Sequence, residues 1–124
     1  MEVGSKISES IDSAALLELR ELTEGSGHPE QFGELIALFL AGLAPGIESM
    51  RGALAEGNEE ELAVRAHGFK GTSASMGAMN LASLCVALEK AAAEANLEMA
   101  QALLGQIENE VDVVRGLLER ETRC

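Results

Sequence analysis

The sequence predicts an all-α fold, an up-down-up-down antiparallel four-helix bundle with a short extra helix at its N-terminal end. Three observations support this fold class. A chain of 124 residues fits one domain with a single hydrophobic core. Alanine and leucine dominate and β-branched residues are sparse, a composition that favours helix. Apolar residues recur with a helical period, and no period-two alternation is long enough for a sheet.

The N-terminal part of the chain is expected to contain a tail and a short helix. Residues 1–10 are expected to form a flexible tail, and residues 11–124 a single domain. Asp12 or Ser13 can cap the first helix, because both side chains accept hydrogen bonds from free N–H groups of a first turn. The glycine-rich stretch 25–27 ends this helix.

The second helix is expected to begin with Pro29, since a proline is well placed as the first residue of a helix. Its apolar stripe continues past Pro45, which lacks an N–H and clashes with the preceding turn. The sequence therefore predicts a kink or an interruption at Pro45. The helix is expected to resume through Leu54 and to end at Gly57.

Three further helices are expected in the C-terminal half. The third follows Asn58, carries glutamates in its first turn, where the helix dipole favours negative charge, and ends at Gly77. The fourth covers residues 79–95 and the fifth residues 97–121. Because the loops between these segments are short, successive helices are expected to be antiparallel neighbours.

Charge and composition exclude several classes of function. The formal net charge is −12, and the chain has three phenylalanines but no tyrosine or tryptophan. Nucleic acid is therefore not an expected partner, because an acidic surface repels phosphates and single-strand modules need aromatic platforms. No signal peptide and no uninterrupted apolar run of membrane-spanning length is visible. The sequence predicts a cytoplasmic monomer, with Cys85 as a buried core residue and no disulfide framework.

The sequence offers no site for a metal ion or a cofactor. The segment 68–72 has the residue types of a phosphate-binding loop but the wrong spacing. His28 and His67 lie far apart and have no cysteine or carboxylate at metal-ligand spacing. His28 precedes Pro29 and is expected to be a solvated loop or cap residue. His67 is therefore the remaining candidate for a residue with a chemical role.

His67 is predicted to lie on an exposed face of the third helix. At 100° per residue it falls on the far side from Phe69, with Lys70 three residues on and on the same patch of surface. His67 and Glu89 are equally distant from the turn at Ala78, so an antiparallel hairpin brings them to the same height. A carboxylate on Nδ1 would fix the tautomer and leave Nε2 as the exposed nucleophile.

Small and basic residues around His67 predict a surface that another protein approaches. Gly71 and Ala74 are among the small residues crowded on this helix, although a glycine inside a helix costs about 1 kcal/mol relative to alanine. Arg65, Lys70 and Lys90 make residues 62–90 basic within an acidic chain. Such a surface suits a phosphoryl group or an acidic partner, and Arg65, Gly71, Ala74 and Lys90 are the expected docking residues. From spacing alone, an ordinary surface histidine with solvated charges around it remains an alternative.

The segment that carries these residues resembles a known family. The run from Ala66 to Ala78, AHGFKGTSASMGA, is followed by Leu81, by Leu84 and Cys85, and by Leu88 and Glu89. This pattern closely resembles histidine-containing phosphotransfer (Hpt) domains of two-component phosphorelays. Their pattern is His-x-x-Lys-Gly, then Ser or Ala, a Gly near the helix end, and Leu-x-x-Leu-Cys-x-x-Leu-Glu. The wider layout of the chain is also similar to the family.

The resemblance implies a role for each residue of the motif. His67 would carry the phosphoryl group on Nε2, and Lys70 would help to hold or neutralise it. Gly71 would leave room for the partner, and Glu89 would orient the imidazole through Nδ1. The partners would be response-regulator receiver domains, a hybrid sensor histidine kinase, or both. Mg²⁺ and most of the chemistry would come from the receiver, so this chain would be a phosphocarrier without enzymatic activity of its own.

Other functions stay open at this point. An Hpt-like module could bind a kinase or a receiver and regulate it without carrying phosphate. An enzyme could use His67 and Glu89 as an acid–base pair, although the sequence shows neither a separate nucleophile nor an oxyanion hole. Within the family, His67 could also receive phosphate directly from an ATP-binding kinase module.

Overall fold

The computed structural model describes residues 10–122 of the chain and confirms the all-α class, because none of these residues forms a strand. The helices are α2 (Ser13–Gly25), α3 (Glu30–Ala55), α4 (Glu59–Ser75), α5 (Met79–Ala93) and α6 (Leu97–Thr122). Residues 1–9 of the expected tail lie outside the described residues, and Ser10, its last residue, is buried.

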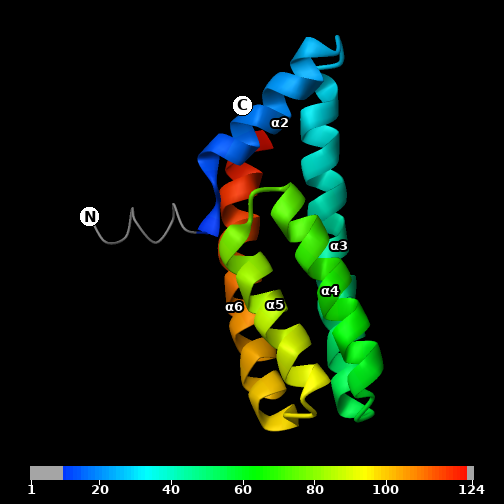
Figure 1. The fold of residues 1–124 in the computed structure, drawn as a ribbon. Helices are drawn as coiled ribbons and strands as arrows, with labels where there is room; N and C mark the ends of the chain where they lie inside the picture. The colour runs from blue at the N-terminus through cyan, green and yellow to red at the C-terminus, as the bar shows by residue number, and fades with distance from the viewer. Residues whose placement is uncertain (1–9, 123–124) are drawn as a thin grey trace, which may run out of the picture.

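The four longer helices contact one another in a ring. α3 packs against α4 and α6, and α5 packs against the other side of both α4 and α6. In Figure 1, α3 and α5 run downwards and α4 and α6 run upwards. α2 contacts α3 and lies obliquely at the end where α3 begins and α6 ends (Figure 1).

The ring encloses one hydrophobic core to which every helix contributes its apolar stripe. Burial of these side chains is the main favourable term that holds the helices together. Side chains that are fully removed from solvent are Ile36, Leu43 and Met50 of α3, Leu62 of α4, Leu81, Cys85 and Leu88 of α5, and Ile107, Val114 and Leu118 of α6.

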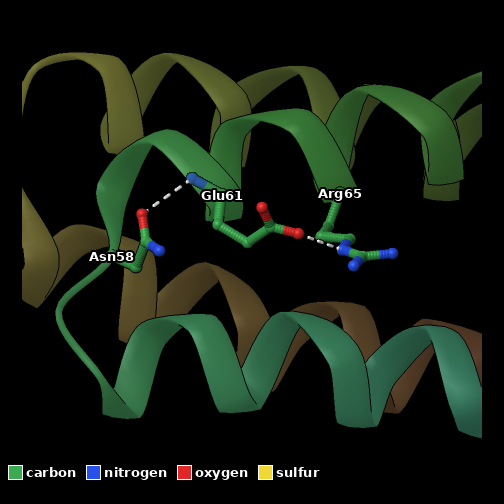
Figure 2. A network of polar contacts seen from close by, with 3 residues as sticks. All are labelled: Asn58, Glu61 and Arg65. Atoms are coloured by element: carbon green, nitrogen blue, oxygen red, sulfur yellow. Dashed lines mark hydrogen bonds and ion pairs between the residues drawn. The ribbon is translucent and has the colours of Figure 1, made fainter.

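Side-chain caps start the helices where the sequence predicts them. Asp12 is the N-cap of α2, and its Oδ1 accepts hydrogen bonds from the backbone N–H groups of Ala14 (3.0 Å) and Ala15 (3.4 Å). Asn58 is the N-cap of α4, and its Oδ1 accepts a bond from the N–H of Glu61 (3.1 Å), as Figure 2 shows. Each cap satisfies donors that the first turn leaves free.

Of the two outcomes predicted for the second helix at Pro45, a kink or an interruption, the interruption is wrong. α3 is helical from Glu30 to Ala55 without a break, with Pro45 inside it. A proline removes one backbone donor, and both Pro45 and the residue one turn earlier, Ala41, are exposed to water. The remaining bonds of α3 and its packing on α4 and α6 keep it helical through this point. Pro29 was predicted to be the first residue of this helix, but it is the N-cap, and the helix begins one residue later at Glu30.

Gly77 connects α2 to the turn between α4 and α5. Its backbone is in the left-handed region (φ +77°), which glycine adopts without strain. Its carbonyl accepts a hydrogen bond of 2.7 Å from the N–H of Asp12. A Cβ at this position would lie 3.0 Å from the backbone oxygen of Asp12. The glycine therefore ends α4 and also lets the start of α2 dock on the turn.

By length and composition, α3 is the one helix within residues 10–122 that could cross a membrane. This is weak evidence, because the core helix of a soluble protein passes the same test. α3 contacts α2, α4 and α6, and its Arg51 forms an ion pair with Glu108 of α6. These contacts make α3 an integral part of the packed helical domain.

Candidate functional site

His67 lies on the exposed face of α4. The side chain of His67 is 63% exposed, whereas the neighbours at Ala66 and Phe69 are buried and hold this helix to the rest of the domain. The helical period places the imidazole on the solvent side because the core-facing positions of α4 fall on the opposite side. His67 is therefore accessible to a large partner.

Glu89 of α5 meets the imidazole. Its Oε1 lies 3.2 Å from Nδ1 of His67. A carboxylate only accepts hydrogen bonds, so Nδ1 must carry the proton that this contact shares. The neutral imidazole then has its lone pair on Nε2, the other ring nitrogen. The side chain of Glu89 is 37% exposed, which leaves its carboxylate partly solvated.

Lys70 supplies a free positive charge on the same face of α4. It lies three residues after His67, so the two side chains extend over one patch of surface. Within the described residues, Lys70 forms no hydrogen bond or ion pair. By contrast, Arg20, Arg51 and Arg65 each pair with a glutamate. The ammonium of Lys70 is therefore available to an anion at His67.

Two glycines leave the surface beside His67 without projecting side chains. A Cβ built at Gly68 or at Gly71 would meet nothing within 4 Å. Neither glycine is therefore required for packing inside the chain, although each lowers the stability of the helix. Ala74 continues this exposed surface one turn beyond Gly71. The surface is flat around the imidazole, so a partner can come close to it.

The residues of the predicted basic surface do not all lie on the same side of α4. Arg65 lies about 160° from His67 around the helix axis, on the side that faces α3. Its guanidinium forms an ion pair with Glu61, one turn earlier (Figure 2). Lys90 is exposed on α5 directly after Glu89. The structure thus gathers His67, Lys70 and Glu89 and places Arg65 on a different side of α4.

An apolar groove between α3 and α4 was not predicted from the sequence. The groove has a volume of about 650 Å³ and contains Leu38, whose side chain is 72% exposed, and Val64, which is 61% exposed. A signal was available in the sequence, because residues 35–47 carry no charge, and the structure shows that many of them are exposed. The remaining lining residues include Leu35, Phe39, Gly42, Pro45, Gly46, Gly68, Phe69, Thr72 and Met76.

Other reactive side chains lie away from this surface. Cys85 is buried, as predicted, and burial raises the pKa of its thiol to about 12. Its thiolate is therefore scarce at neutral pH, so Cys85 is a core residue and not a nucleophile. No three His, Cys, Asp or Glu side chains gather as a metal site in the part of the chain that the structure describes.

Comparison with known proteins identifies the family. The Hpt domain family matches residues 34–117, a range that includes His67, Lys70 and Glu89. The chain belongs to the Hpt domain family. The crystal structure of histidine-containing phosphotransfer protein B (HptB) from Pseudomonas aeruginosa PAO1 superposes with a TM-score of 0.85 at 33% sequence identity. The alignment covers 92% of this chain and 95% of HptB. No curated protein sequence matches this chain significantly.

The comparison confirms the resemblance deduced from the histidine motif. The matched range begins within α3 and leaves α2 outside, whereas the alignment with HptB covers almost the whole chain. Family membership gives this Hpt domain a histidine phosphotransfer role in phosphorelays.

Proposed function

We propose that this chain is a phosphocarrier that accepts a phosphoryl group on Nε2 of His67 from the aspartate of a receiver domain and passes it to another. One observation supports the proposal above all others. An exposed imidazole has Glu89 on Nδ1 at 3.2 Å, which leaves Nε2 as the free lone pair. Lys70 stands beside it with no partner among the described residues.

The proposed transfer is a direct exchange of one bond for another. The Nε2 lone pair attacks phosphorus, the N–P bond forms, and the P–O bond to the aspartate breaks with its electron pair going to the carboxylate. The imidazole gains positive charge as this happens. The Glu89 carboxylate stabilises that charge through the Nδ1 proton, and Lys70 partly neutralises the phosphoryl oxygens. The reverse step returns the group to a second receiver.

The partner supplies the rest of the chemistry in this proposal. Phosphoryl transfer depends on positioning and on a cation that offsets the developing charge, and Lys70 contributes only part of that charge. We propose that Mg²⁺ is bound by the receiver and that this chain, without enzymatic activity of its own, needs no cofactor. Receiver domains, a hybrid sensor histidine kinase, or both are the proposed partners.

The ring of contacts among α3, α4, α5 and α6 supports an up-down-up-down antiparallel four-helix bundle, with α2 as the short extra helix. In the proposed arrangement this closed bundle acts as a cytoplasmic monomer. Gly71, Ala74 and Lys90 form the docking surface next to His67, and Arg65 contributes from the α3 side of α4.

The proposal is tested by mixing phosphorylated receivers with the wild-type chain and with the His67→Gln variant. Label is expected to move to the wild type alone. His67→Gln is expected to keep its helix content and melting temperature, since substitutions at exposed sites usually change stability by about 0.5 kcal/mol or less. Binding of receivers without any transfer would instead support the alternative, a docking module that carries no phosphate.

A further inference from the structure

His67 and Lys70 bring two nitrogen nucleophiles to one patch of the surface of α4. The imidazole of His67 is 63% exposed, with Glu89 at 3.2 Å from Nδ1 and with Nε2 free. Lys70 lies three residues further along the same helix, and residues with this spacing have Cβ atoms about 5–6 Å apart. Because a lysine side chain is long and flexible, its Nζ can reach the space next to Nε2. The proposed phosphoryl transfer uses the charge of Lys70 but not its amine as a nucleophile.

Lys70 is the nucleophile best placed to receive a group from Nε2 of His67. The hydroxyls of Thr72 and Ser75 are also exposed on α4, but they donate to backbone carbonyls of this helix at 3.1 and 3.0 Å. Lys90 is exposed as well, but it lies on α5. It directly follows the glutamate that meets the imidazole, and is therefore turned by about 100° from that glutamate around the helix axis.

The chemical group that suits this pair of nitrogens is an acyl group carried on phosphate. An acyl phosphate is a mixed anhydride with two electrophilic atoms, the phosphorus and the carbonyl carbon. A small acyl phosphate is an anion, so the charge of Lys70 attracts it, and a Cβ position at Gly68 or Gly71 has open space around it. An imidazole suits the attack on such a compound, since far more of it is unprotonated at neutral pH than of a lysine amine.

Attack at the carbonyl carbon is favoured when the acyl phosphate arrives without a protein. Transfer of a phosphoryl group depends on a metal ion and on exact positioning, which the receiver supplies in the proposed function. A free acyl phosphate brings neither of these. The imidazole therefore has less assistance for attack at phosphorus, whereas attack at the carbonyl carbon needs only the lone pair of Nε2 and a phosphate that can leave.

We propose that Lys70 is a site of self-acylation, in which His67 takes the acyl group of a small acyl phosphate and passes it to Nζ of Lys70. The Nε2 lone pair attacks the carbonyl carbon, a C–N bond forms, and the C–O bond to phosphate breaks with its electron pair on the phosphate. Nζ, as the free amine, attacks the same carbon, and the bond to Nε2 breaks with its electron pair returning to the ring. An acyl phosphate and a lysine ammonium thus give an amide, hydrogen phosphate and one proton released to water.

Glu89 assists this sequence as it assists phosphoryl transfer. The ring gains positive charge when Nε2 is acylated, and the carboxylate stabilises that charge through the Nδ1 proton. The product amide is neutral, so acylation removes the positive charge of Lys70. In the proposed function this loss slows the acceptance of a phosphoryl group at His67. That consequence rests on the proposed function, whereas the acylation itself does not.

The test incubates the chain with acetyl phosphate in the absence of any receiver and measures acetylation of each lysine by peptide mass spectrometry. Lys90 is the internal reference, because it is an exposed lysine on the neighbouring helix. The His67→Gln variant removes the proposed carrier of the acyl group. His28→Gln is the matched control, because His28 is also an exposed histidine and has a glutamate, Glu30, at 3.4 Å from its Nδ1.

In the wild type, Lys70 is expected to be acetylated about tenfold or more faster than Lys90, a small part of the gain that well-oriented intramolecular reactions reach. His67→Gln is expected to lower the rate at Lys70 to that at Lys90, and His28→Gln to change neither rate. Equal rates at the two lysines in the wild type would overturn the inference, as would a fast rate at Lys70 that persists in His67→Gln. Release of phosphate that depends on His67 but leaves Lys70 unmodified would overturn it too, because water would then take the acyl group.

A parallel reaction with phosphorylated receivers separates this inference from the proposed function. A chain that acetylates Lys70 through His67 but takes no phosphoryl group from any receiver would support the inference and contradict the proposed function. A chain that takes the phosphoryl group but acetylates Lys70 no faster than Lys90 would overturn the inference and leave the proposed function intact.

Discussion

At the scale of single residues, the two ring nitrogens of His67 have different surroundings. Glu89 holds Nδ1 and thereby determines that Nε2 presents the lone pair. The carboxylate is only partly buried, so its contribution is smaller than that of a fully desolvated pair. In the proposed function, this chain adds the orientation of the ring and the charge of Lys70 to the chemistry of the partner.

Glu89→Ala is expected to slow phosphoryl transfer by about tenfold without abolishing it, the lower end of what a lost hydrogen bond to a charged group costs. Glu89→Gln keeps an acceptor for the Nδ1 proton and should retain more activity than the alanine variant. Single-turnover transfer rates measure both. Glu94→Ala, on an exposed glutamate near the end of α5, serves as the control. Full activity in Glu89→Ala would remove Glu89 from the mechanism.

Gly71→Ala is expected to stabilise the protein and to impair transfer at the same time. Alanine favours the helix by up to about 1 kcal/mol, and its Cβ would enter open space and not a neighbouring side chain. In the proposed function, the partner approaches through that space. Thermal unfolding and transfer rates should therefore change in opposite directions. Gly116→Ala, its counterpart on α6, should gain stability and transfer normally; equal transfer by the two variants would contradict a docking role for Gly71.

At the scale of helices, the hairpin of α4 and α5 determines which residues meet at the site. The register was predictable, because His67 and Glu89 are equally distant from the turn and the sequence marks that turn with Gly77. The groove was harder to predict, since it depends on how closely α3 approaches α4 at Gly46 and Phe69. Of the kink or interruption predicted at Pro45, the interruption was wrong, because local propensity was weighed without the packing that holds α3 on both sides.

Gly77→Ala is expected to destabilise the protein more than Gly57→Ala. Both glycines have a positive φ, +77° and +68°, so both variants incur the strain of a left-handed alanine. Only at Gly77 would the new Cβ also press on the Asp12 backbone, at 3.0 Å; at Gly57 it would meet nothing within 4 Å. Chemical denaturation measures the difference, which isolates the docking of α2. Equal losses in the two variants would show that this contact contributes nothing.

At the scale of the whole molecule, no charged side chain among the described residues belongs to the buried core, so few buried groups make stability depend on pH. Cys85 is the clearest of them. Its thiol has a pKa of about 12 in the folded chain against 9.0 for an exposed thiol, because burial disfavours the thiolate. The unfolded chain therefore releases this proton first as the pH rises. The contribution of Cys85 to stability is present below pH 9 and is lost between about pH 9 and pH 12.

This dependence is measurable in a Cys124→Ser background, which leaves one thiol. Denaturation at a series of pH values should show that stability declines more steeply above pH 9 with Cys85 than with Cys85→Ala. The two variants differ only at residue 85, so the difference between the two slopes reports the buried thiol. Parallel slopes would contradict the assignment of a buried, protonated Cys85.

The overall fold class was the most predictable property of the molecule, because helix composition, caps and short loops all favour the same answer. The position of Arg65 could be foreseen only in part, since its ion pair with Glu61 depends on the conformations of the two side chains on α4. Docking of α2 on Gly77 is a contact between residues far apart in the sequence, and no local pattern reports it.

The central claim is that Nε2 of His67 carries the phosphoryl group. It is tested most directly by phosphorus NMR of the chain after transfer from a phosphorylated receiver, with the nitrogen assigned through coupling to the ring protons. We expect a single phosphohistidine signal from the Nε2 isomer, which is absent in His67→Gln. A signal from the Nδ1 isomer, or one that persists in His67→Gln, would contradict this account of the site.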